Sequence, residues 1–66
     1  MRLTVKYENL EEKECARLRV LLDGYDVKLQ KIGEGPMLFA NADLAEALEI
    51  VKIAAGFPYR ELMLRS

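Results

Sequence analysis

Alternating apolar and polar residues predict two strands with one buried face each, because side chains along a strand point to opposite sides with a period of two. Residues 2–7 alternate first, and residues 25–32 alternate again. Their apolar positions include Leu3, Val5, Tyr7, Val27 and Leu29. Residues 37–40, Met-Leu-Phe-Ala, carry no charge and predict a short central strand. The turn at residues 33–36, with two glycines for unusual φ and a proline, would join it to the preceding strand as a hairpin.

A helix is predicted between the first two strands, beginning at Asn9 and ending at Gly24. Asn9 is a favourable N-cap, and Glu12 follows three residues later, at the spacing of a capping box. Gly24 can adopt the positive φ that often follows the last turn of a helix. At about 100° per residue, one stripe of this segment is apolar. Its members are Cys15, Leu18, Leu21 and Leu22.

A second helix is predicted to start at position 41 or 43, where Asp43 and Glu46 repeat the spacing of cap and carboxylate. Gly56, with a proline two residues later, predicts its end. Ile53 lies off the broad apolar face of this segment. That face consists of Leu44, Ala47, Leu48, Ile50, Val51, Ala54 and Ala55.

The tail, residues 57–66, is open to two interpretations. Leu62 and Leu64 alternate with Glu61, Met63 and Arg65, which favours a closing strand. A short helix starting at the proline of position 58 remains the alternative. With the strand, the order becomes β-α-β-β-α-β, the ferredoxin-like α+β arrangement. Right-handed crossovers would then put both helices on one face of a short antiparallel sheet and leave its other face open.

The short length of the chain favours association with another subunit, because its own core is expected to be small. The 66 residues predict a single domain, 1–66, with a marginal core, since so short a chain buries only about 60% of its unfolded surface. Its hydrophobic content of 52% is high for this length. Ile53, Tyr59 and Met63 are apolar residues left over for a partner. Oligomerisation is the remaining supplement to the core, because one cysteine forms no internal disulfide.

Charge and hydropathy limit the partners and the cellular location that we expect for this protein. Ten basic residues against eleven acidic ones provide no global field that would attract nucleic acid. No apolar run is long enough to cross a membrane, and the start of the chain has no signal-peptide pattern. A single thiol without a targeting segment predicts a cytoplasmic protein.

The sequence offers no residues that we expect to be catalytic. Cys15 has no histidine to activate it and lies on an apolar stripe, which is typical of a small buried hydrophobe. The carboxylates cluster in first turns of the predicted helices, where capping and the helix dipole explain them. With no histidine and one cysteine, the sequence predicts no metal site and no cofactor, and we expect a protein that is not an enzyme.

The open sheet face is the predicted place of function. It would carry Lys6, Lys28, Gln30 and Phe39 as candidate binding residues, although the pattern leaves open whether Met37 and Phe39 or the alternate residues of that strand point there. The element order, residues 3–10 (Leu-Thr-Val-Lys-Tyr-Glu-Asn-Leu) and residues 35–40 (Gly-Pro-Met-Leu-Phe-Ala) resemble an RNA-recognition-motif domain. That family stacks bases on sheet aromatics, whereas this chain has Thr4 at the first-strand aromatic position.

Two functions follow from these observations. The first is a non-enzymatic protein-interaction module that docks on a protein partner or associates with itself as a homodimer, through the open sheet face or an edge strand. The alternative is a weak single-stranded nucleic-acid-binding domain that uses the open face. A solution mass that does not change with concentration would count against the first, and no binding at low salt would remove the second.

Overall fold

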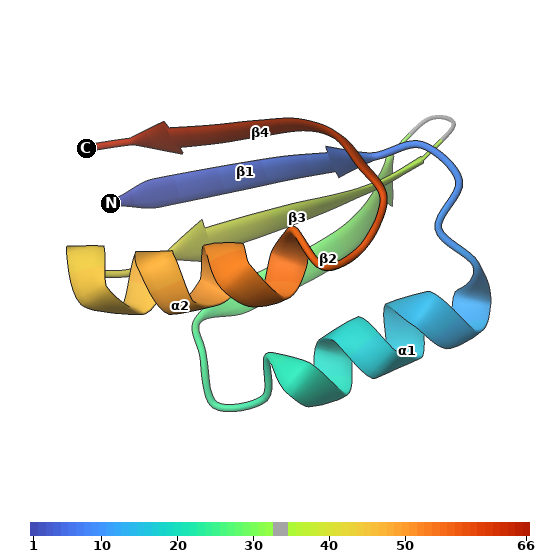
Figure 1. The fold of residues 1–66 in the computed structure, drawn as a ribbon, viewed down its shortest axis with the longest axis horizontal. Coiled ribbons are helices and arrows are strands. Elements are labelled where there is room, and N and C mark those ends of the chain that lie inside the picture. Colours follow the sequence, from blue (N-terminus) through green and yellow to red (C-terminus); the bar gives the residue numbers. More distant parts are fainter. Residues whose placement is uncertain (33–34) are drawn as a thin grey trace.

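Six elements follow one another in the predicted order in a computed structural model that describes residues 1–32 and 35–66 (Figure 1). They are β1 (Arg2–Tyr7), α1 (Glu12–Leu21), β2 (Val27–Ile32), β3 (Gly35–Asn41), α2 (Leu44–Ala54) and β4 (Tyr59–Arg65). The ferredoxin-like β-α-β-β-α-β arrangement is confirmed, and the tail is a strand. None of the helices in the described ranges is long and apolar enough to span a membrane.

The four strands form one antiparallel sheet in the order β2-β3-β1-β4, so β1 and β3 are central and β2 and β4 are edges. Both helices lie on the same side of this sheet, and the two chain ends lie together at one end of it (Figure 1). Register fixes the pleat: Val5 pairs with Leu38 and Leu62, and Leu3 pairs with Ala40. These residues point to the helices and form the core with Leu18 and other buried side chains, namely Tyr7, Leu22, Ile50, Ala54 and Phe57.

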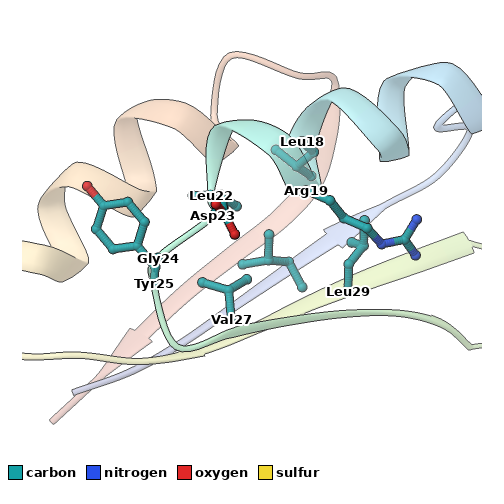
Figure 2. Close-up of a pocket in the computed structure, with 9 residues that line it drawn as sticks. Leu18, Arg19, Leu22, Asp23, Gly24, Tyr25, Val27 and Leu29 are labelled. Carbon is teal, nitrogen blue, oxygen red and sulfur yellow. The ribbon is translucent and has the colours of Figure 1, made fainter.

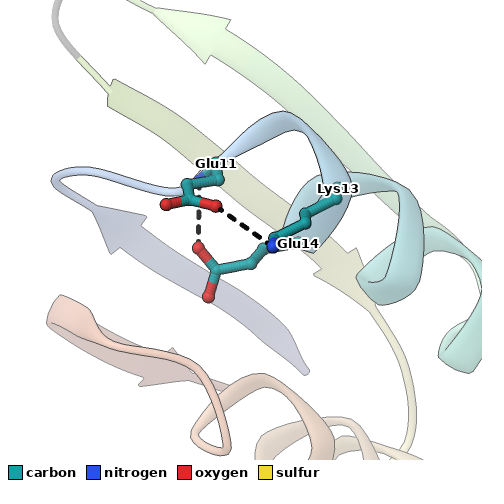
Figure 3. Close-up of polar contacts among 3 residues, drawn as sticks. All are labelled: Glu11, Lys13 and Glu14. Carbon is teal, nitrogen blue, oxygen red and sulfur yellow. Dashed lines mark hydrogen bonds and ion pairs between the residues drawn. The ribbon is translucent and has the colours of Figure 1, made fainter.

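The N-terminus of α1 lies two residues later than predicted. Its N-cap is Glu11, not Asn9, and the backbone N–H of Glu11 donates to Glu14 Oε1 at 3.0 Å (Figure 3). Lys13 Nζ lies 3.9 Å from Glu11 Oε2, an exposed ion pair worth little. The first turn starts two residues late because Leu10 packs against the core before the helix begins.

The remainder of α1 largely follows the prediction. Leu18 and Leu22 are buried, Cys15 is half-buried, and Leu21 is exposed, so its place on the core stripe was wrong. Gly24 has φ +93° and provides the predicted left-handed residue, just past the C-cap at Leu22.

In α2 the predicted cap is confirmed, since the Glu46 N–H donates to Asp43 Oδ1 at 2.9 Å. The predicted apolar face needs correction. Leu44 and Leu48 are exposed, whereas Ile53, expected off the stripe, packs against the core. Rotation of the helix about its axis explains the difference: the sheet contacts the line of Ala47, Ile50 and Ala54 rather than the whole apolar arc. Gly56 ends the helix without a positive φ.

The hairpin between β2 and β3 requires a glycine for a reason other than φ. Gly33 and Glu34, part of the predicted turn, lie outside the described residues. Gly35 already belongs to β3, and its φ is not positive. A Cβ placed on Gly35 would stand 2.1 Å from the backbone oxygen of Tyr7. Glycine is therefore needed where β3 passes close to the end of β1.

Candidate interaction surfaces

The open sheet face is organised in rows that cross the strands. Phe39 of β3 stands between Lys28 of β2 and Thr4 of β1, and Thr4 pairs on its other side with Met63 of β4. The pleat that the sequence left open is thereby decided, since Leu38 and Ala40 are buried on the helical side. Phe39 is half-buried in the middle of the sheet and has Lys28 directly opposite.

A second row runs parallel to the first. Met37 pairs with Gln30 on one side and with Lys6 on the other, and Lys6 pairs with Glu61. All four predicted binding residues therefore share the open face: Lys6, Lys28, Gln30 and Phe39. Lys6 is engaged within the sheet, because its Nζ lies 3.8 Å from Glu61 Oε1 in a half-exposed ion pair.

Positive charge gathers on this face. Arg2 stands opposite Arg65, so that two like charges face each other across β1 and β4. With Lys6 and Lys28 they make four cations, against one carboxylate, Glu61, in the described part of the four strands' open side. The chain as a whole has a net charge of −1, so its acids lie mainly elsewhere.

The second surface is the β4 flank, for which the sequence predicted an edge strand and Met63 but not the exposure of the α2 leucines. We define it as the outer edge of β4 with the exposed or half-buried apolar side chains beside it: Leu44, Leu48, Leu62, Met63 and Leu64. Exposure is 54% for Leu44 and 50% for Leu48, both on α2, and 43% for Met63 and 38% for Leu64, both on β4. Leu62 is half-buried against the core. The sequence signal for this surface was the breadth of the α2 apolar arc, wider than a sheet contact requires.

The direction of the α2 leucines follows from a contact on the opposite side of that helix. Tyr25, which leads into β2, donates its hydroxyl to Glu49 Oε2 at 2.6 Å. This hydrogen bond, the largest cause, raises the pKa of Tyr25. At 100° per residue, Glu49 and the pair Leu44 and Leu48 lie on opposite sides of the buried line of α2. Since β2 and β4 are opposite edges of the sheet, the leucines lie toward β4.

The two sheet edges differ in how they meet solvent. The charged side chains of the β2 edge, the exposed Lys28 and Lys31, are both positive, and like charges of this kind discourage the addition of an identical strand. The β4 edge pairs only with β1 in the described sheet, has apolar side chains on both faces, Met63 on one and Leu64 on the other, and carries charges of both signs in Arg60, Glu61 and Arg65. An unpaired strand flanked in this way is a template for a further strand.

A pocket of about 220 Å³ lies between the end of α1 and the β2 side of the sheet (Figure 2). Leu18, Leu22 and Leu29 form apolar walls, while Arg19 and Asp23 are exposed residues of its lining. Its volume is below the ~300–1,000 Å³ usual for small-molecule sites. Cys15 lies outside this pocket and lines another, open pocket of about 420 Å³ beside Glu8, Glu12 and Lys31, with its Sγ 4.0 Å from the Leu10 carbonyl oxygen. The lining of the 220 Å³ pocket brings together no nucleophile and base.

No family model, no curated protein and no solved structure matched this chain.

Proposed function

We propose that this protein is a non-enzymatic protein-interaction module that binds its partner through the β4 flank. The observation that carries the proposal is the unpaired edge of β4 with exposed apolar side chains on both of its faces. A strand added there would satisfy the outward backbone groups of β4 and cover Met63 and Leu64 together.

The energetics favour a bound state. Covering the exposed half of a leucine contributes about 1 kcal/mol, and Leu44, Leu48 and Leu64 are each about half exposed or slightly less. Several such contacts are large compared with the stability expected of a chain of 66 residues. Binding through this flank would therefore stabilise the fold as well as join two proteins. The single thiol and the sequence pattern favour a cytoplasmic setting for this role.

The experiment is affinity capture from an extract of the source cells with the native protein and the variant Leu44→Glu/Leu48→Glu. The matched control is Ala45→Glu/Lys52→Glu, whose sites are exposed on the outward side of the same helix. Captured proteins are identified and binding is measured again with purified components. We expect binding that the control retains and the leucine variant loses. Binding that both variants retain equally would refute the role of the β4 flank.

A second function is favoured by the charge on the open sheet face. Phe39 provides an aromatic surface, Lys28 stands directly opposite, and Arg2, Lys6 and Arg65 add positive charge nearby. A single nucleic-acid strand could stack one base on Phe39 with its phosphates along the cations.

This alternative is tested by fluorescence anisotropy with labelled single-stranded oligonucleotides at low salt. Weak binding is expected to fall with increasing salt, and to fall further in Lys28→Glu and Phe39→Ala. Gln30→Glu tests whether charge elsewhere on the β2 edge matters as much as charge at Lys28. No detectable binding of the native protein at low salt would remove this function.

A further inference from the structure

The sequence of β4 is complementary to itself. When two identical strands pair antiparallel about a twofold axis, the numbers of facing residues add to a constant, so the axis position decides every pair. With the axis at Met63, Leu62 faces Leu64 of the second copy, and Glu61 faces its Arg65. Facing residues then share a face of the sheet, apolar against apolar and acid against base.

Neighbouring registers are worse. An axis at Glu61 brings the two Glu61 carboxylates together, where like charges repel. An axis at Leu62 sets Glu61 against Met63 and Arg60 against Leu64. With the axis at Leu64, most of β4 would have no partner in the second copy, because only residues 62–66 would overlap. The Met63 register is the one that joins opposite charges and keeps the leucines facing each other.

Arg65 gives an independent reason for this register. It faces the like-charged Arg2 within the sheet, and it takes part in neither of the ion pairs that the described residues form. Glu61 of a second copy would supply the missing negative charge beside this arginine pair. Glu61 would at the same time keep its contact with Lys6, so that each carboxylate would lie between two cations.

The position of α2 is consistent with the same antiparallel pairing of two β4 strands. Antiparallel pairing about an axis perpendicular to the sheet keeps the helices of both copies on one side. The two α2 helices would then flank the seam, and Leu44 and Leu48 of each copy would be turned toward the other. Parallel pairing of β4 would place the helices on opposite sides and leave these leucines exposed. The exposed side of α2 thus selects the antiparallel arrangement that the charges of β4 also select.

Resting on the proposed function, we propose that the partner of the β4 flank is a second copy of this chain. The two β4 strands pair antiparallel about Met63, join two four-stranded sheets into one, and set Glu61 of each copy beside Arg65 of the other. Growth stops at the dimer, because the edges that remain are β2 strands whose lysines, Lys28 and Lys31, repel further addition.

The test is a pair of charge reversals measured by sedimentation velocity. Glu61→Arg and Arg65→Glu each place like charges at both facing positions, and each alone is expected to weaken dimerisation about tenfold or more. Mixing the two variants restores opposite charges at both positions of the mixed dimer. We therefore expect the mixture to associate about as tightly as the native protein. Circular dichroism confirms that each variant is folded.

The matched control is Arg17→Glu, which makes the same charge change at an exposed residue of α1, outside the proposed interface. It is expected to leave the dissociation constant within about twofold of the native value. Mixed variants that stay as weakly associated as each one alone would overturn the register.

A cysteine at the axis gives a second readout. In a Cys15→Ser background, Met63→Cys places two thiols directly opposite at ~4.5–5.5 Å between Cα atoms, within disulfide range. Oxidation should yield a covalent dimer, while Gln30→Cys on the β2 edge should yield little. A native protein that stays monomeric at every concentration, with no cross-link at position 63, overturns the second-copy inference. If capture of another protein still depends on Leu44 and Leu48, the proposed function survives that result; if it does not, both fail.

Discussion

The hydroxyl of Tyr7, near the end of β1, donates a hydrogen bond of 2.8 Å to the carbonyl oxygen of Ala54 in the last turn of α2. Both residues are buried, and 47 positions of sequence separate them. The Ala54 carbonyl also accepts a longer bond of 3.4 Å from the Phe57 N–H, so the Tyr7 hydroxyl is the shorter of its two donors. The Tyr7 bond fixes the end of α2 on the centre of the sheet, and with it the rotation that turns Leu44 and Leu48 toward β4.

Tyr7→Phe is expected to lower the free energy of unfolding by about 1 kcal/mol, because it removes the shorter of the two hydrogen bonds to the buried Ala54 carbonyl, leaves only the 3.4 Å bond from the Phe57 N–H, and keeps the ring. The measurement is urea denaturation followed by circular dichroism. Tyr59→Phe is the control, since that ring is 47% exposed, and it should change stability by less than about 0.5 kcal/mol. Equal effects of the two substitutions would show that the buried bond contributes nothing.

Alkaline pH should weaken the fold through the same residue. Burial, as the main cause, raises the pKa of Tyr7 to about 12, whereas the ordinary value is 10.0. Below pH 10 the phenol is protonated in both states; between pH 10 and 12 only the unfolded chain releases the proton, so stability falls as pH rises. The native protein should lose about 1–2 kcal/mol more than Tyr7→Phe over this interval. Parallel pH profiles of the two proteins would contradict the assignment.

Gly35→Ala should be among the most damaging single-methyl changes in the chain. The new Cβ would stand 2.1 Å from the Tyr7 carbonyl oxygen, so β1 and β3 would have to separate locally. We expect a loss of about 2–4 kcal/mol in urea denaturation. Gly24→Ala is the comparison: its φ is +93° but nothing lies within 4 Å, so only backbone strain of about 1–2 kcal/mol applies. A smaller loss at Gly35 than at Gly24 would show that the close approach is not real.

The helix caps offer a paired test. Asp43→Ala removes the side-chain acceptor of the Glu46 N–H and should cost about 1 kcal/mol. Asn9→Ala should change stability by less than about 0.5 kcal/mol, because Asn9 is exposed and α1 is capped at Glu11. Thermal unfolding of the two variants compares them directly. A larger loss of stability for Asn9→Ala than for Asp43→Ala would indicate that Asn9 caps α1, as the sequence pattern predicted.

The strands and α2 could be predicted from the sequence because period and caps are local signals. The alternation of Leu3, Val5 and Tyr7 sets the face of β1 by itself. Residues 37–40 have no polar alternation, so only pairing with β1 determines that Phe39 faces outward. The four candidate residues of the open face were therefore brought together as predicted, once the register supplied the pleat of β3.

The β4 flank was harder to foresee. An apolar arc on α2 does not tell which part reaches the sheet, and Leu44 and Leu48 were expected in the core. Their exposure depends on the rotation of α2, which contacts distant in sequence determine: Tyr7 with Ala54 and Tyr25 with Glu49. Leu64 alternates like a core residue but lies on an edge strand, which only the strand order reveals.

The most direct test of the self-association account is sedimentation equilibrium of the native protein from micromolar to about millimolar concentration, beside Leu48→Glu. Leu48 is 50% exposed, so the substitution should leave the fold intact in circular dichroism. We expect the native mass to rise to twice the monomer mass and Leu48→Glu to remain monomeric over most of that range. A native mass that stays at the monomer value throughout, or a variant that dimerises as tightly as the native protein, would contradict the account.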